Sequence, residues 1–206
     1  KKKKKKKKMS DVEPKKHVNW HKRAMAQLAK NNYHKAISDW TKAVELDESF
    51  IHGYYYRGKA QQRIGECGKA HSDYNKVYAL DASHEDVDTL IHETETCVTN
   101  YEKALHFLHK KDCASAQPLM EELLTIAPYD TKLNFGMVEC HLHNKDYQAM
   151  LRYTANILRI EPQNLDALLL RGRAYYSLGE YEMAIKHFKS GLKSDPDHKT
   201  HKAEFK

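Results

Sequence analysis

Residues 165–198, LDALLLRGRAYYSLGEYEMAIKHFKSGLKSDPDH, contain two helical patterns on either side of Gly179. Pro196 closes this stretch, and Pro162 and Pro128 precede it at intervals of 34 residues. Small residues occur at Gly172 and Ala184, where two antiparallel helices would need to approach closely. A fixed period of this length predicts helix-turn-helix units that stack on one another into a solenoid.

The same register extends toward the N-terminus of the chain. The predicted units are 17–50, 51–84, 97–130, 131–164 and 165–198. The fourth unit is degenerate but in phase, because Met150 and Thr154 replace the Ala and Phe found at the corresponding positions of the last unit. The repeats therefore cover most of the chain.

Twelve residues, EDVDTLIHETET at 85–96, separate the second unit from the third. They contain no Pro or Gly, and Val87, Leu90 and Ile91 have helical spacing. We expect the first helix of the third unit to begin early, after Asp81, Ser83 or Asp86 as its cap, and to form one long helix.

The repeated pattern resembles the tetratricopeptide-repeat family. The resemblance implies an all-α superhelical solenoid of five helix-turn-helix units, with an extended helix between units two and three. We predict a disordered leader at 1–16, an N-terminal subdomain at 17–84, the helical insertion at 85–96 and a second subdomain at 97–206.

The charge of the chain depends on its first eight residues, which are all lysine. Without them, 27 of the 35 basic residues remain against 28 acidic ones, a net charge of about −1. The high isoelectric point therefore does not indicate nucleic-acid binding, and only native lysines at 1–8 would form a basic arm for RNA or anionic lipid. No apolar run is long enough to span a membrane.

The cysteines and histidines are the residues of this chain that could act as metal ligands. Cys67, Cys97, Cys113 and Cys140 have no CxxC spacing, and we expect them to pack as thiols between helices, which leaves the redox compartment open. His17 with His21, and Cys140 with His143, supply only two ligands each, so we expect no metal and no cofactor. Phosphate loops and hydrolase motifs are also missing, so we expect no enzyme activity.

In tetratricopeptide proteins the first helix of each unit lines a concave groove. The resemblance places the following residues in that groove: Met25, Leu28, Tyr55, Tyr56, Lys59, Arg63, Val98, Tyr101, Leu105, Leu108, Phe135, Glu139, Leu142, Leu169, Leu170, Arg173 and Tyr176. Such an apolar, aromatic face is typical of a polypeptide-binding site. The alternative is that neighbouring helices cover about half of these side chains.

A carboxylate clamp for the acidic tails of Hsp70 and Hsp90 is not indicated. In one register the first clamp positions hold His21, Met25 and Tyr56. In the register that starts at the third unit, the five clamp positions hold Tyr101, Leu105, Gly136, Asp166 and Leu170. These sets lack the cations that would hold a carboxylate in bidentate geometry.

The order of repeats, acidic helical insertion and further repeats ending KSDPDHKTHKAEFK resembles co-chaperones that combine tetratricopeptide repeats with a J domain. The resemblance implies binding of unfolded polypeptides, delivery to Hsp70 through the J domain and a location in the endoplasmic reticulum lumen; a cytoplasmic location is the alternative. In that family client binding maps to the N-terminal repeats. Groove geometry then nominates Met25, Leu28, Tyr55 and Tyr56 first, and Tyr101, Leu105 and Phe135 second.

The chain departs from this family in three respects. It contains no His-Pro-Asp tripeptide, so we expect no J domain here, and only two units precede the insertion where the family has three. The family's cysteine pair is half absent, because Ala127 stands where the partner of Cys140 would fall. The main alternative function is a scaffold that recognises one defined peptide or a protein kinase.

Overall fold

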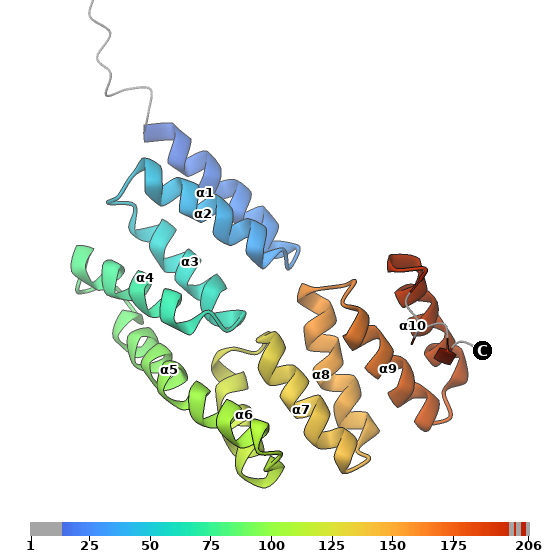
Figure 1. The fold of residues 1–206 in the computed structure, drawn as a ribbon. Helices are drawn as coiled ribbons and strands as arrows, with labels where there is room; N and C mark the ends of the chain where they lie inside the picture. Colours follow the sequence, from blue (N-terminus) through green and yellow to red (C-terminus); the bar gives the residue numbers. More distant parts are fainter. Residues whose placement is uncertain (1–13, 198–199, 201–202, 205–206) are drawn as a thin grey trace, which may run out of the picture. The chain divides into compact units, whose positions relative to one another are not determined.

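The computed structural model describes residues 14–197, 200 and 203–204, and these residues form helices joined by short turns (Figure 1). Of the predicted disordered leader at 1–16, residues 1–13 lie outside the described residues, whereas Pro14 to Lys16 belong to helix α1. The helices are α1 (Pro14–Ala29), α2 (Tyr33–Leu46), α3 (Ile51–Arg63), α4 (Cys67–Leu80), α5 (Val87–His109), α6 (Cys113–Ile126), α7 (Thr131–His143), α8 (Tyr147–Ile160), α9 (Leu165–Ser177) and α10 (Tyr181–Ser194).

These helices form five consecutive pairs, as the period of 34 residues predicted. Helix α5 is the exception in length: it has 23 residues, whereas its partner α6 has 14. It begins directly after Asp86, one of the three expected start points. The prediction that the insertion extends the first helix of the third unit is therefore confirmed.

The repeat is visible in the backbone of the turn inside each pair. The fifteenth residue of every unit has a positive φ: 59° at Asn31, 88° at Gly65, 57° at Lys111, 58° at Lys145 and 80° at Gly179. This left-handed conformation ends the first helix and reverses the chain. Glycine adopts it without strain, whereas lysine does so at a cost.

The two helices of a unit approach where a small residue faces a large one. A Cβ atom built on Gly172 would lie only 2.3 Å from the Phe188 ring, so glycine is required there. In the degenerate fourth unit the corresponding positions hold the larger Val138 and the smaller Thr154, both of which are buried. The exchange of sizes explains how Thr154 is accommodated where other units have an aromatic ring or methionine.

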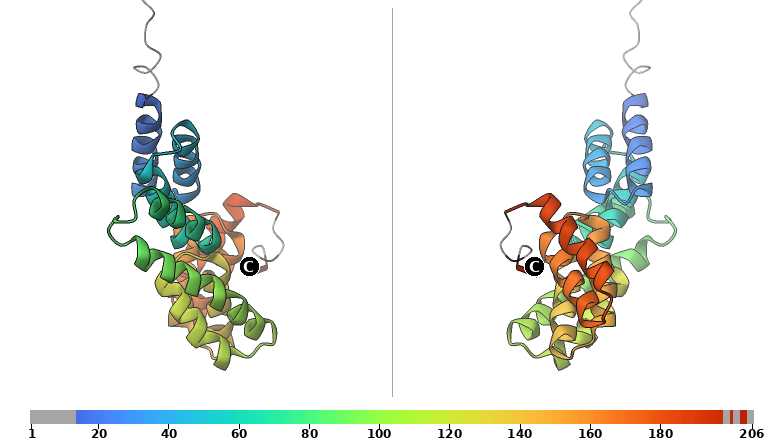
Figure 2. Two further views of the ribbon diagram at one scale, coloured as in Figure 1. Left: turned by 90° about the vertical axis from the view of Figure 1, so that its left-hand side faces the viewer. Right: turned by 90° about the vertical axis from the view of Figure 1, so that its right-hand side faces the viewer.

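The chain divides into two compact units. Unit 1 comprises the described residues up to Gln61 together with Lys69–Ile91, and unit 2 comprises Gln62–Gly68 and the described residues from His92 onward. This division follows contacts in space, whereas the predicted subdomains follow the repeats. Within unit 1, α1 and α2 lie side by side (Figures 1 and 2).

Each unit has its own hydrophobic core. In unit 1, Trp40 is fully buried, and Tyr74 and Val77 pack with Val87 of α5. In unit 2, a larger core contains Leu133, Met137 and Met150. Helix α10 adds Phe188, which packs with Leu169 and Ala184. Among the described residues, no helix is long and apolar enough to cross a membrane.

Candidate polypeptide-binding surface

The structure separates the seven predicted client-binding residues into two sets. Helices α1 and α3 of unit 1 carry Met25, Leu28, Tyr55 and Tyr56. In unit 2, Tyr101 and Leu105 lie on the part of α5 from His92 onward, and Phe135 lies on α7. The two sets are therefore two candidate surfaces, each defined within its own unit.

The exposure of the predicted groove residues varies. Met25 is exposed, and the other six nominated residues are half-buried. Larger exposed fractions occur at groove positions outside that selection, namely 47% at Val98, 42% at Leu142 and 63% at Tyr176. Leu169 is buried against Ala184 and Phe188 rather than lining a groove, so its assignment to the groove was wrong. The repeat that contains Leu169 packs tightly because α9 and α10 approach each other closely at Gly172.

The nominated tyrosines of unit 1 form an aromatic cluster. The Tyr56 ring stacks on buried Trp40 with 6.0 Å between centroids, and Tyr55 meets Tyr56 edge-on at 5.2 Å. The ammonium of Lys59 lies 4.6 Å from the Tyr55 ring centroid. Each tyrosine thus uses part of its ring for packing and leaves part accessible. This surface offers aromatic area that is already held in place.

His21 supports this cluster as a neutral side chain. Trp40 donates its indole N–H to Nδ1 of His21 at 3.0 Å, and the His21 ring lies 5.6 Å from that of Tyr56. An acceptor at Nδ1 requires that this nitrogen be unprotonated. Burial lowers the pKa of His21, and the nearby His52 and His17 lower it further.

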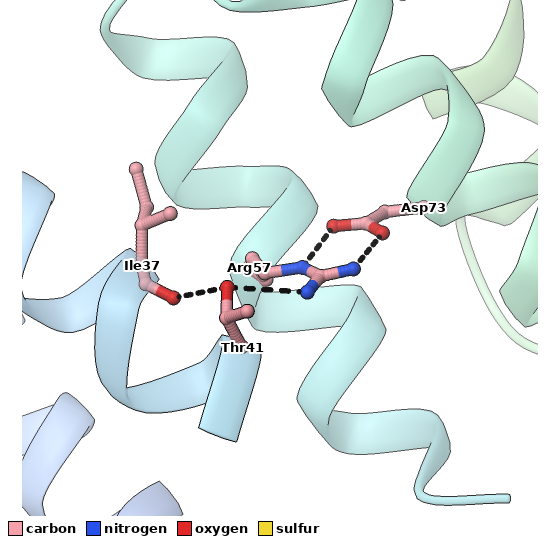
Figure 3. Close-up of polar contacts among 4 residues, drawn as sticks. All are labelled: Ile37, Thr41, Arg57 and Asp73. Atoms are coloured by element: carbon pink, nitrogen blue, oxygen red, sulfur yellow. Dashed lines mark hydrogen bonds and ion pairs between the residues drawn. The ribbon is translucent and has the colours of Figure 1, made fainter. Parts of the chain in front are cut away.

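A buried ion pair positions α3, the helix that carries both tyrosines (Figure 3). Arg57 donates two hydrogen bonds to the Asp73 carboxylate, of 2.7 and 2.6 Å, and a third to Thr41 at 3.2 Å. Thr41 in turn donates to the carbonyl of Ile37 at 2.9 Å. The guanidinium therefore links α3 to α4 on one side and to α2 on the other.

The same pair occurs one repeat earlier, where Arg23 donates two bonds of 2.6 Å to Asp39. Both members lie 34 residues before Arg57 and Asp73, so the repeat period is itself the sequence signal for these contacts. In the fifth unit the corresponding residues are Arg171 and His187. There Arg171 donates to the Leu151 carbonyl instead.

In unit 2, Tyr101 is held at both ends of its ring. Its hydroxyl lies 3.4 Å from Oδ1 of Asp130, and its ring packs against the core. Burial first, and then the Asp130 carboxylate, raise the pKa of Tyr101. Asp130 also caps α7 by accepting the N–H of Leu133 at 2.8 Å.

The cysteines pack between helices as expected, but they do so as disulfides and not as separate thiols. Disulfide bonds join Cys67 to Cys97 and Cys113 to Cys140. Cys67 and Cys113 are the first residues of α4 and α6, the second helices of repeats two and three. Each bonds to a cysteine on the first helix of the following repeat, which is α5 for Cys67 and α7 for Cys113. Stacking of units brings these positions together although 30 and 27 residues separate them in the chain. Ala127 is accordingly not the missing partner of Cys140.

The disulfide also removes Cys140 as a metal ligand beside His143. Nδ1 of His21 is occupied by the Trp40 hydrogen bond, while His17 lies 3.8 Å from Asp47. Within residues 14–197, 200 and 203–204, no group of three or more His, Cys, Asp or Glu side chains is placed to hold a metal ion.

Comparison with known families supports the repeat assignment. Tetratricopeptide-repeat models match residues 18–50 and 165–198, the first and last of the five units. This is a tetratricopeptide-repeat fold. The predicted all-α solenoid of such repeats is confirmed.

The curated proteins that resemble this chain include DnaJ proteins. The DnaJ protein P58IPK homolog of Arabidopsis thaliana is 27% identical over 177 residues, which cover 85% of this chain and 37% of that protein. DnaJ homolog subfamily C member 3 of Gallus gallus is 25% identical over 186 residues, covering 89% of this chain and 37% of its own length. The predicted resemblance to DnaJ proteins is thus confirmed, and the chain spans well under half of their length.

A solved structure shows the same fold. The crystal structure of the P58(IPK) TPR domain superposes with a TM-score of 0.81 and 21% sequence identity, over 95% of this chain and 55% of that one. At this identity the likeness establishes a common fold. It does not identify which residues bind a partner.

Proposed function

We propose that this chain is the polypeptide-binding repeat region of a co-chaperone that holds unfolded or misfolded proteins. The observation that carries the proposal is the aromatic cluster of unit 1, where half-buried Tyr55 and Tyr56 lie on α3 and α1 presents exposed Met25. The similarity to DnaJ proteins supports a protein-binding role of the co-chaperone type.

The physical basis is burial of apolar area on both partners. Unfolded chains expose apolar segments, and each Å² removed from water contributes about 25 cal/mol. Because Tyr56 is held by Trp40 and His21, little side-chain entropy is lost on binding. Binding of this kind should tolerate many sequences and resist salt.

Delivery of bound clients to Hsp70 through a J domain outside this sequence is part of the proposal. So is a location in the endoplasmic reticulum lumen, which the two disulfides support because such bonds persist in oxidising compartments. Alkylation of the protein from its native source tests this point. Four protected cysteines are expected, whereas free thiols would favour the cytoplasm.

The test of client binding is suppression of the aggregation of a chemically denatured model protein, measured at low and high salt and without residues 1–8. Met25→Glu should reduce protection several-fold, because it places a charge on the exposed apolar surface. Ala26→Glu is the matched control, since it adds the same charge at the next exposed position of α1. Equal effects of the two variants would contradict the proposed surface.

Tyr55→Ala combined with Tyr56→Ala should also reduce protection. Since Tyr56 stacks on Trp40, this variant is interpretable only if helicity and the unfolding midpoint are retained. Tight binding of one peptide by a protein that ignores denatured models would instead identify a scaffold for a defined partner, such as a kinase.

A further inference from the structure

Unit 2 contains a pocket of 240 Å³ beside the Cys67–Cys97 disulfide. It lies where α4 begins and α5 passes, and its walls include both cysteines, Gly68, Val98, Tyr101 and Glu102. Binding sites for small molecules usually measure about 300–1,000 Å³. This pocket is smaller than such sites, and a single large apolar side chain fits within it.

The pocket is held in a fixed shape. The disulfide joins its two walls, with Cys67 and Cys97 both buried. On the third side, Tyr101 is oriented by the contact of its hydroxyl with Asp130. Gly65, in the left-handed conformation at φ 88°, brings the α3–α4 turn so close to Asp130 that a Cβ atom would overlap its carboxylate. Little reorganisation would therefore accompany binding.

The walls combine an apolar interior with one charge. Val98 is 47% exposed, and half-buried Tyr101 supplies further apolar surface. Glu102 is exposed and forms no ion pair with any residue that the structure describes. The pocket thus suits an apolar side chain whose neighbour is positively charged.

We propose that this pocket binds one Leu, Met or Phe side chain of an extended client segment, with an adjacent Lys or Arg paired to Glu102. The inference rests on the proposed function, because it assigns a sequence preference to the client. A folded partner is not favoured, since a specific protein interface buries about 1,200–2,000 Å² and this site accepts one side chain.

Two variants block the pocket without disturbing the core. A Cβ atom built on Gly68 meets no atom within 4 Å, so Gly68→Phe starts in open space at the pocket wall. Val98→Asp places a charge inside the pocket at a position that is already half exposed. Gly68→Ala is the control that leaves the pocket open, and Ile185→Asp changes an equally exposed apolar residue on α10.

The probes are two fluorescein-labelled 12-residue peptides of Gly and Ser. One contains a Leu flanked by Lys, and the other contains a Leu flanked by Glu. By fluorescence anisotropy, the Lys peptide should bind more tightly, and Gly68→Phe should weaken it by about tenfold or more. Val98→Asp should weaken the Glu peptide more than the Lys peptide, because its carboxylate disfavours the Leu side chain of both peptides but repels only the Glu flanks. Glu102→Lys should reverse the preference between the peptides, because it inverts the charge at the mouth.

The outcomes separate this inference from the proposed function when denatured-client binding is measured on the same proteins. If clients bind but the blocking variants behave like Gly68→Ala, or the two peptides bind equally, the pocket inference is wrong and the proposed function stands. If the wild-type protein binds no denatured client, the proposed function itself fails. Loss of peptide binding in Ile185→Asp as well would also overturn the assignment to this pocket.

Discussion

Individual residues in the turns carry strain that the repeat does not require. The left-handed position holds Gly in two units but Lys111 and Lys145 in the third and fourth. A non-glycine residue in this conformation costs about 1–2 kcal/mol. The fold tolerates this cost because the helices on either side are fixed by packing, so these lysines are the places where single substitutions should improve stability.

Lys145→Gly should raise the free energy of unfolding of unit 2 by about 1 kcal/mol, because glycine adopts a φ of 58° without strain. Urea unfolding followed by circular dichroism measures the change. Lys186→Gly, at an exposed position inside α10, should have the opposite effect and lower stability by about 1 kcal/mol. Destabilisation by both variants would show that the turn is not strained.

His187 should make unit 2 sensitive to acid. Burial, together with Arg171 and Lys186, lowers its pKa from 6.5 to about 4, and its ring stacks on Tyr175. Between these two values the unfolded chain binds a proton that the folded protein does not, so stability falls as the pH drops below about 6.5.

Between pH 7 and pH 5 we expect this group to cost about 1 kcal/mol, after allowance for its partial exposure to solvent. An NMR titration of the His187 imidazole should report a midpoint near 4. In His187→Gln the loss of stability on acidification should be smaller by the same amount. Titration at the ordinary value of 6.5 would contradict this account.

Single elements are joined by polar contacts whose energetic weight depends on burial. The Arg57–Asp73 and Arg23–Asp39 pairs occupy equivalent repeat positions with similar bond lengths. The arginines differ, however, since the Arg57 side chain is 16% exposed and that of Arg23 is 57% exposed. Loss of the carboxylate leaves an uncompensated guanidinium charge only where water cannot solvate that guanidinium in its place.

Asp73→Asn should therefore destabilise unit 1 by about 3 kcal/mol, because it leaves the Arg57 guanidinium without its carboxylate between α2, α3 and α4. Asp39→Asn is the matched comparison, and a much smaller loss is expected because water can solvate Arg23. Chemical denaturation monitored by the fluorescence of buried Trp40 reports on this unit. Equal losses for the two variants would contradict the dependence on burial.

At the scale of the whole molecule, the disulfides are distributed unevenly. All four cysteines lie in unit 2, and the disulfides close loops of 30 and 27 residues. The Cys113–Cys140 loop lies wholly in unit 2, whereas the Cys67–Cys97 loop also includes Lys69–Ile91 of unit 1, so residues 33–61 lie outside both loops. A cross-link over a loop of this length contributes about 3–4 kcal/mol, chiefly by restricting the unfolded chain. The two units should therefore differ in their response to reduction.

Dithiothreitol should lower the hydrogen-exchange protection of residues 92–197 while residues 33–61 keep theirs. Hydrogen exchange read by mass spectrometry resolves the two regions. The variant Cys113→Ser with Cys140→Ser should reproduce part of the loss without reductant, and reductant should then act only through Cys67–Cys97. A uniform loss across both units would mean that they unfold together.

Much of this architecture could be predicted from the sequence because it is local and periodic. The 34-residue interval of Pro128, Pro162 and Pro196, the small residues at Gly172 and Ala184, and the uninterrupted helical pattern of 85–96 depend on neighbours within one or two helices. Such signals can be recognised in the sequence alone, because they involve residues that are close together in the chain. The five helix pairs and the long α5 follow from them.

The tertiary structure decided the features that depend on how one helical repeat stacks on the next repeat. It paired Cys67 with Cys97 and Cys113 with Cys140, buried Leu169 while leaving Val98 exposed, and enclosed Arg57 between three helices. These outcomes depend on side chains that are distant in the chain and on which of them exclude water. Residue types at fixed spacing do not contain that information, because burial is a property of the packed assembly.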